Sequence, residues 1–156
     1  MVNVHLAMKK RIIIKNQEGA ALVEFAIVLP LLILLFIGIC EFGLLWYNSQ
    51  VIINASREGA RHGIVQWENA DGTFYSDLEV EALIDAIAQN YCSDRLVTFG
   101  PNNPPVVVST WTSRAFAQHV TVQVTYNYGF LVPSLFHLGL TKQIVGRTVM
   151  KMENTI

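Results

Sequence analysis

The longest hydrophobic stretch of the chain lies near its N-terminus and predicts one long helix. Residues 25–40 carry no charge, and residues 22–47 include only two charged side chains, Glu24 and Glu41. A helix of 26 residues is about 39 Å long at about 1.5 Å per residue, which crosses a hydrocarbon core of about 30 Å with some tilt. We therefore predict a membrane-spanning helix over residues 20–47.

Beyond this stretch the helical spacing continues, but the repeating positions carry small side chains. The positions recur every three or four residues and are Ile52, Ser56, Gly59 or Ala60, and Gly63. Small side chains allow close approach of another element. We expect a helical extension over residues 48–65 that packs against a sheet or a second helix.

The remaining residues, 66–156, predict a small exported domain. Ser76 and Glu79 form a capping-box pattern at the start of an amphipathic helix, after a loop with a turn at Asp71. A strand is predicted over residues 116–128, because residues 120–128 alternate between valine or tyrosine and polar side chains, which is typical of a half-buried antiparallel strand. Further strands are expected at residues 96–99, 106–112 and 141–152. The predicted fold class is α+β, with one short helix and a three- to four-stranded antiparallel sheet.

The distribution of charge predicts how the helix is oriented in the membrane. Four of the 11 basic residues precede the apolar run, at positions 9, 10, 11 and 15, against one acid, Glu18. The excess of positive charge predicts that the N-terminus is cytoplasmic and that the domain is exported. No basic patch with interleaved aromatic residues occurs elsewhere, so nucleic acid is not expected as a partner.

Candidate chemistry is sparse. The four histidines are scattered, no metal-ligand spacing or C-x-x-C pair occurs, and no nucleophile or phosphate-binding motif is present. Cys40 and Cys92 are each expected to act as small buried apolar residues. We predict no enzymatic activity, no catalytic, cofactor-binding or metal site, and no small-molecule substrate.

Small residues stand between the basic segment and the apolar run, which is not the order of a cleaved secretory signal. Gly19 is followed by Glu24 and Phe25, five and six residues later. This arrangement resembles the prepilin peptidase site of type IV and Flp-type pilins. The longer matches, over residues 18–30, 38–43 and 55–61, resemble the TadE-like pseudopilins of the tight adherence system.

The resemblance implies a processing event and a role. A membrane prepilin peptidase would cut between Gly19 and Ala20 and remove the basic leader, residues 1–19. Glu24 would then pair with a subunit's N-terminal amine during assembly. The resemblance also implies a pilin-like fold, a bacterial inner-membrane location with a periplasmic domain or incorporation into an extracellular pilus, and other pilins or pseudopilins as partners. The implied function is that of a minor pseudopilin in assembly or priming of a Flp-type pilus.

Three more charged residues are candidates for contacts in a helix bundle. Glu41 either reaches exported water or pairs with an arginine or lysine of a neighbouring subunit. Arg57 and Arg61 share one helical face, which is either solvated or a contact surface for a partner pilin.

Two other classes of protein stay open at this stage. A signal-anchored periplasmic binding or scaffold protein of an envelope complex would keep its leader. A periplasmic enzyme would require the scattered histidines and acids to converge in a cleft.

Overall fold

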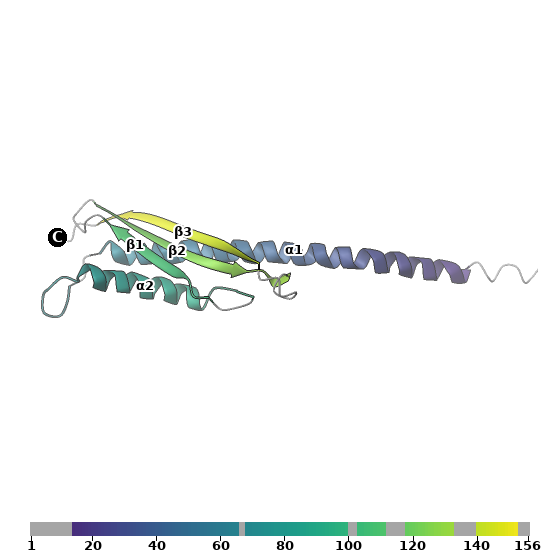
Figure 1. Cartoon of the computed structure of the whole chain (residues 1–156), viewed down its shortest axis with the longest axis horizontal. Helices are drawn as coiled ribbons and strands as arrows, with labels where there is room; N and C mark the ends of the chain where they lie inside the picture. The colour runs from purple at the N-terminus through teal and green to yellow at the C-terminus, as the bar shows by residue number, and fades with distance from the viewer. Residues whose placement is uncertain (1–13, 66–67, 100–102, 112–117, 133–139, 153–156) are drawn as a thin grey trace, which may run out of the picture. The chain divides into compact units, whose positions relative to one another are not determined.

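The computed structural model describes residues 14–65, 68–99, 103–111, 118–132 and 140–152, with side chains from residue 19 onward (Figure 1). The chain divides into two compact units, residues 1–40 and 41–156. The elements in order are α1 (Ile14–Gly63), α2 (Asp77–Ser93), β1 (Val106–Trp111), β2 (His119–Gly129) and β3 (Thr141–Lys151). Two helices and a separate antiparallel sheet confirm the predicted α+β class.

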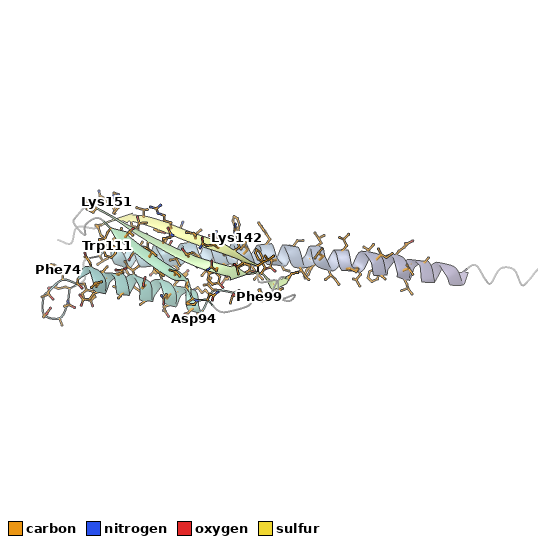
Figure 2. All side chains as sticks on the ribbon, in the orientation of Figure 1. Phe74, Asp94, Phe99, Trp111, Lys142 and Lys151 are labelled. Atoms are coloured by element: carbon orange, nitrogen blue, oxygen red, sulfur yellow. The ribbon has the colours of Figure 1, made fainter. Side chains whose placement is uncertain are left out.

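The described part of the first unit is the N-terminal portion of α1. The helix continues through Pro30. Figure 2 draws its side chains as sticks along the helix. The large apolar ones are exposed, for example Ile27 at 72% and Ile39 at 64%. By length and composition the described residues contain one helix able to cross a membrane, with a mean hydropathy of 2.8 in its most apolar window and none of that window buried. The predicted long apolar helix is confirmed.

The second unit contains a three-stranded antiparallel sheet with β2 in the centre. Strand β2 pairs with β1 through Val124 and Val107 and with β3 through Val124 and Gly146. The alternation predicted for β2 is confirmed, because one set of side chains is buried and the other is not. The buried set is Val120, Val122, Val124, Tyr126 and Tyr128. The predicted strand residues 112 and 116–117 and most of the 129–140 connection lie outside the described residues.

The strand predicted at residues 96–99 is wrong, since this segment has no strand pairing in the structure. The buried side chain of Asn48 takes the place of a neighbouring strand. Its amide donates to the Val97 carbonyl at 2.5 Å, and its carbonyl accepts from the Val97 N–H at 3.0 Å. The backbone polar groups of Val97 are therefore satisfied by one side chain of α1.

The predicted stripe of small residues in α1 is confirmed as a packing surface. A Cβ added to Gly59 would lie 3.2 Å from Ile84 of α2 and 3.5 Å from Val122 of β2. Ser56 is fully buried, and its hydroxyl donates to the Ile53 carbonyl at 2.8 Å. Because that bond uses its one proton, Ser56 accepts from the Thr148 hydroxyl at 2.7 Å. The C-terminal part of α1 thus contacts both α2 and the sheet.

Helix α2 begins at the predicted capping box. The Ser76 hydroxyl accepts from the Glu79 N–H at 3.4 Å, and the Glu79 carboxylate accepts from the Ser76 N–H at 2.7 Å. The Ser76 hydroxyl also donates to the Glu79 carboxylate at 2.7 Å, and the two bonds that this carboxylate accepts from Ser76 lower the pKa of Glu79. The residues that α2 buries are Val80, Ile84, Ala88 and Cys92. Glu79 therefore acts in capping, as the sequence predicted.

Replacing Gly146 with alanine should destabilise the second unit by about 2 kcal/mol. A Cβ at this position would lie 2.7 Å from the Ile52 carbonyl oxygen, so β3 and α1 would have to move apart. Thermal unfolding of the full chain in detergent measures the change. Gly43→Ala is the matched control, because nothing lies within 4 Å of its added Cβ and alanine favours a helix by about 0.5–1 kcal/mol. Equal melting temperatures for the two variants would contradict this packing.

Candidate functional site

The Gly19–Ala20 bond lies within α1, and both residues are exposed. Nothing lies within 4 Å of a Cβ built at Gly19. This glycine differs from Gly63, whose added Cβ would lie 2.7 Å from Ile84, and from Gly146. A glycine inside a helix costs about 0.5–1 kcal/mol relative to alanine. Packing within the described chain does not account for that cost at Gly19.

Glu24 and Phe25 follow on the same helix, and both are exposed, Phe25 at 59%. Within the described residues, the structure gives the Glu24 carboxylate no hydrogen bond or ion pair. Residues four apart lie on one face of a helix, so Ala20 and Glu24 are neighbours along α1. The site is therefore an uncovered, apolar helical surface that carries one unpaired carboxylate.

Glu41 stands in a different environment, at the first residue of the second unit. Its carboxylate accepts a hydrogen bond from the Tyr128 hydroxyl at 2.9 Å. It also accepts from the backbone N–H of Leu131, at 2.9 and 3.0 Å to its two oxygens. Hydrogen bonds to a charged acceptor are about twice as strong as neutral ones. Glu41 therefore joins α1 to the end of β2 and the residues that follow it.

Tyr128 is the residue of this cluster that the sequence did not identify. Its side chain is fully buried, and its ring packs edge-on against Phe130 with centroids 5.4 Å apart. Burial raises the pKa of the Tyr128 hydroxyl, and the hydrogen bond to Glu41 raises it further. A signal was present, because the alternation placed Tyr128 on the buried face and a buried phenol needs a hydrogen-bond partner. The predicted contact of Glu41 with a neighbouring subunit stays a prediction.

Arg57 and Arg61 are exposed on α1, and neither takes part in the Glu41 cluster. On the same segment, Glu58 approaches His62 with 3.5 Å between carboxylate and imidazole. Exposed pairs of this kind contribute about 0–1 kcal/mol. The structure thus leaves both arginines at the surface, and their predicted role in partner contacts stays a prediction.

The two cysteines differ in environment. Cys92 is buried in the core, and burial raises the pKa of its thiol to about 11, so it is protonated and inert near neutral pH. Cys40 is exposed on the apolar surface of α1, where the sequence had predicted a buried residue. No group of three or more histidines, cysteines and acids that could hold a metal ion occurs among the described residues.

Comparison with known proteins identifies the N-terminal segment. The model of the TadE-like protein family matches residues 19–61. The match begins at the predicted cleavage glycine and ends at Arg61, so it confirms the resemblance seen in the sequence. No curated protein and no solved structure matches the chain.

Proposed function

The segment of this chain over residues 19–61 is TadE-like, and on that premise we propose that the protein is a minor pseudopilin that a prepilin peptidase processes after Gly19. The basic leader is cytoplasmic, the apolar part of α1 crosses the bacterial inner membrane, and residues 48–156 are periplasmic. Processing releases a subunit that takes part in assembly or priming of a Flp-type pilus. Its partners are the peptidase and other pilins or pseudopilins.

The observation that carries this proposal is the uncovered apolar surface of α1. Soluble monomers rarely expose contiguous apolar patches of more than a few hundred Å². Here the described side chains of residues 22–36 are largely exposed, from Leu22 at 70% to Phe36 at 66%. Lipid covers such a surface in a membrane-stored subunit, and neighbouring helices cover it in a filament. One surface therefore suits both states that a pseudopilin passes through.

Gly19 supports the proposed cleavage position. A peptidase has to open the helix locally before it can reach the Gly19–Ala20 bond, which lies inside α1. Glycine lowers the cost of that opening, because it is a weak helix former. The absence of any neighbour within 4 Å of its Cβ position also leaves this part of the helix accessible. The proposed cleavage therefore accounts for a glycine at position 19, whereas packing does not.

Glu24 supports the proposed assembly step. Carboxylates in a membrane-spanning segment are costly and are usually paired with a cation or face a polar cavity. Cleavage creates an amine at Ala20 of every subunit, and this cation is available to the Glu24 of a neighbour. Glu24 has no partner within the described residues. An ion pair with the Ala20 amine of a neighbouring subunit would therefore neutralise its carboxylate.

The position of the mature N-terminus tests this function. In membranes from cells that contain the prepilin peptidase, mass spectrometry of the extracted protein should find Ala20 as the first residue. Gly19→Leu should leave the leader attached, because the larger side chain blocks recognition and stabilises the helix. Gly38→Leu is the matched control, since nothing lies within 4 Å of its Cβ either, and it should be processed normally. An intact leader on the unmodified protein would reject the proposal in favour of a signal-anchored periplasmic protein.

A further inference from the structure

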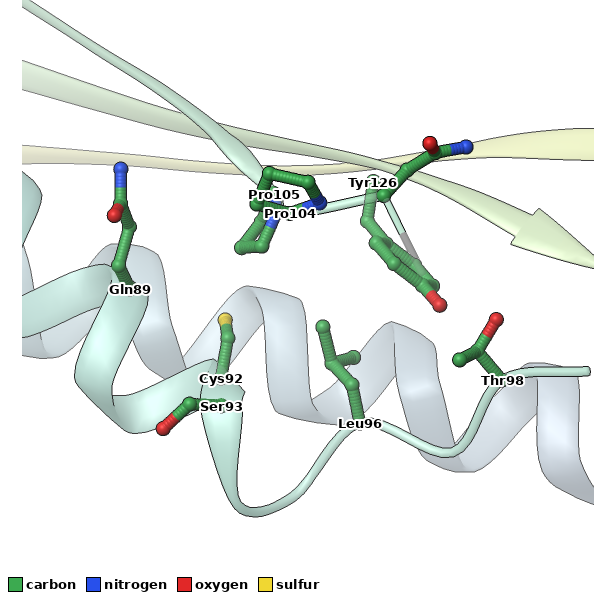
Figure 3. Close-up of a pocket in the computed structure, with 9 residues that line it drawn as sticks. Gln89, Cys92, Ser93, Leu96, Thr98, Pro104, Pro105 and Tyr126 are labelled. Atoms are coloured by element: carbon green, nitrogen blue, oxygen red, sulfur yellow. The ribbon is translucent and has the colours of Figure 1, made fainter. Parts of the chain in front are cut away.

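The second unit contains a cavity whose lining includes none of the residues of the Glu41 cluster. It has a volume of about 420 Å³ and lies between the C-terminal end of α2, the segment that follows it, the residues just before β1, and β2 (Figure 3). Small-molecule sites are typically clefts of about 300–1,000 Å³. The lining residues are Gln89, Cys92, Ser93, Leu96, Thr98, Asn103, Pro104, Pro105 and Tyr126. The cavity is thus large enough for a compact ligand.

Tyr126 gives this cavity an unpaired hydrogen-bonding group. The residue is 2% exposed, and within the described part of the chain its hydroxyl has no hydrogen-bond partner. Figure 3 shows the side chain reaching from β2 toward Leu96 and Thr98, into the cavity. Tyr128, two residues along the same face of β2, has its hydroxyl bonded to Glu41. Buried polar groups are nearly always hydrogen-bonded, so the Tyr126 hydroxyl calls for a partner beyond the described residues.

The lining determines which partner is suitable. None of the nine lining residues carries a formal charge near neutral pH, and the buried Cys92 thiol is protonated because its pKa is raised to about 11. A charged ligand would lose its hydration without gaining an opposite charge. Gln89 and Asn103 offer side-chain amides, which supply both donors and an acceptor and are therefore complementary to another amide. Leu96 and the two prolines provide apolar contact for the rest of the ligand.

We propose that this cavity is a binding site for a small uncharged amide whose carbonyl oxygen accepts a hydrogen bond from the Tyr126 hydroxyl. An amide of this kind occurs both in N-acetylated sugars and in uncharged peptides, which are two sources of the same chemistry. The cavity lies in residues 89–126, outside the segment that matches the TadE-like family. The site is therefore a property of the exported domain and does not depend on the proposed processing.

Titration of the full chain in lipid nanodiscs, followed by NMR of ring-labelled tyrosine, tests the site. The probes are N-acetylglucosamine and N-acetylalanine methylamide, each with a charged counterpart, glucosamine and N-acetylalanine. We expect saturable binding of an uncharged probe and at least about tenfold weaker binding of its counterpart. Tighter binding of the sugar or of the peptide amide identifies the source. Failure of both uncharged probes to bind, or equal binding of the charged ones, would overturn the proposal.

Two matched variants show whether the Tyr126 hydroxyl makes the contact. Tyr126→Phe should weaken binding about tenfold and should not lower the melting temperature of the ligand-free protein, because it removes an unpaired group. Tyr128→Phe makes the same chemical change outside the cavity, and it should keep the affinity but lower the melting temperature. Unchanged affinity in Tyr126→Phe would overturn the proposal. A loss of stability equal to that of Tyr128→Phe would also overturn it, by showing that the hydroxyl is already satisfied in the free protein.

Discussion

Replacing Glu24 with alanine should prevent the protein from entering filaments while leaving its insertion into the membrane intact. The change removes an exposed carboxylate that has no partner within the described residues, so the folded domain loses no contact. Insertion should not be impaired, because removing a charged side chain from a membrane-spanning segment removes an unfavourable contribution to insertion. Immunoblots of membranes and of sheared filaments, in cells that lack the unmodified protein, measure the two effects separately.

Two conservative variants show whether the charge of Glu24 is the cause. Glu24→Gln keeps the size and the hydrogen-bonding capacity but removes the charge, so it should behave like the alanine variant. Glu24→Asp keeps the charge on a shorter side chain and should retain part of the incorporation. Normal filaments with the glutamine variant would show that an ionic pair with the Ala20 amine is not needed.

Replacing Glu41 with leucine should destabilise the second unit by about 2–5 kcal/mol. The substitution leaves two donors without an acceptor, the hydroxyl of fully buried Tyr128 and the N–H of Leu131. Each unsatisfied buried donor costs about 1–3 kcal/mol. Thermal or chemical unfolding of the unassembled chain in detergent should show the loss. The stability has to be measured on the unassembled protein. If Glu41 bound only a neighbouring subunit, its replacement would not change the stability of the isolated chain.

A double-mutant cycle separates the Tyr128 bond from the rest of this cluster. Glu41→Gln keeps an acceptor oxygen and should cost less than leucine. Tyr128→Phe alone should cost about 1 kcal/mol, and its effect should nearly vanish in the Glu41→Leu background, because the hydrogen bond is already gone. Additive losses would show that Glu41 and Tyr128 do not act on each other, contrary to the 2.9 Å contact between their oxygens.

Local patterns predicted the regular elements well, for reasons that single residues illustrate. The capping box of Ser76 and Glu79 needs only neighbours three residues away, so the sequence contains all of its partners. Strand β2 was recognisable because alternate side chains face opposite sides of the sheet. The strand prediction at residues 96–99 was wrong, although the apolar side chains of this segment are typical of a strand. Its backbone is hydrogen-bonded to the side chain of Asn48, 49 residues away from Val97.

The candidate site residues also fall into two groups, those that the local sequence suggested and those whose contacts depend on the fold. Gly19, Ala20, Glu24 and Phe25 form a short linear motif beside an apolar run, so the sequence alone could suggest it, and its role stays a prediction. The partners of Glu41 were not predictable, because Tyr128 and Leu131 approach it only through the fold. The same holds for the cavity at Tyr126, whose lining comes from α2, the segment after it, the residues just before β1, and β2.

By itself, the sequence determined that this chain has a basic N-terminal segment, a long apolar helix, a pilin-like cleavage motif and an α+β domain. These features depend on composition and on spacings of a few residues. Only the tertiary structure decided which residues of α1 pack against the rest of the second unit. Leu44 and Leu45 pack against the core, although they continue the apolar run. Hydrophobic side chains favour lipid and protein interior alike, so their pattern cannot distinguish the two, whereas the contacts of Glu41 and Asn48 can.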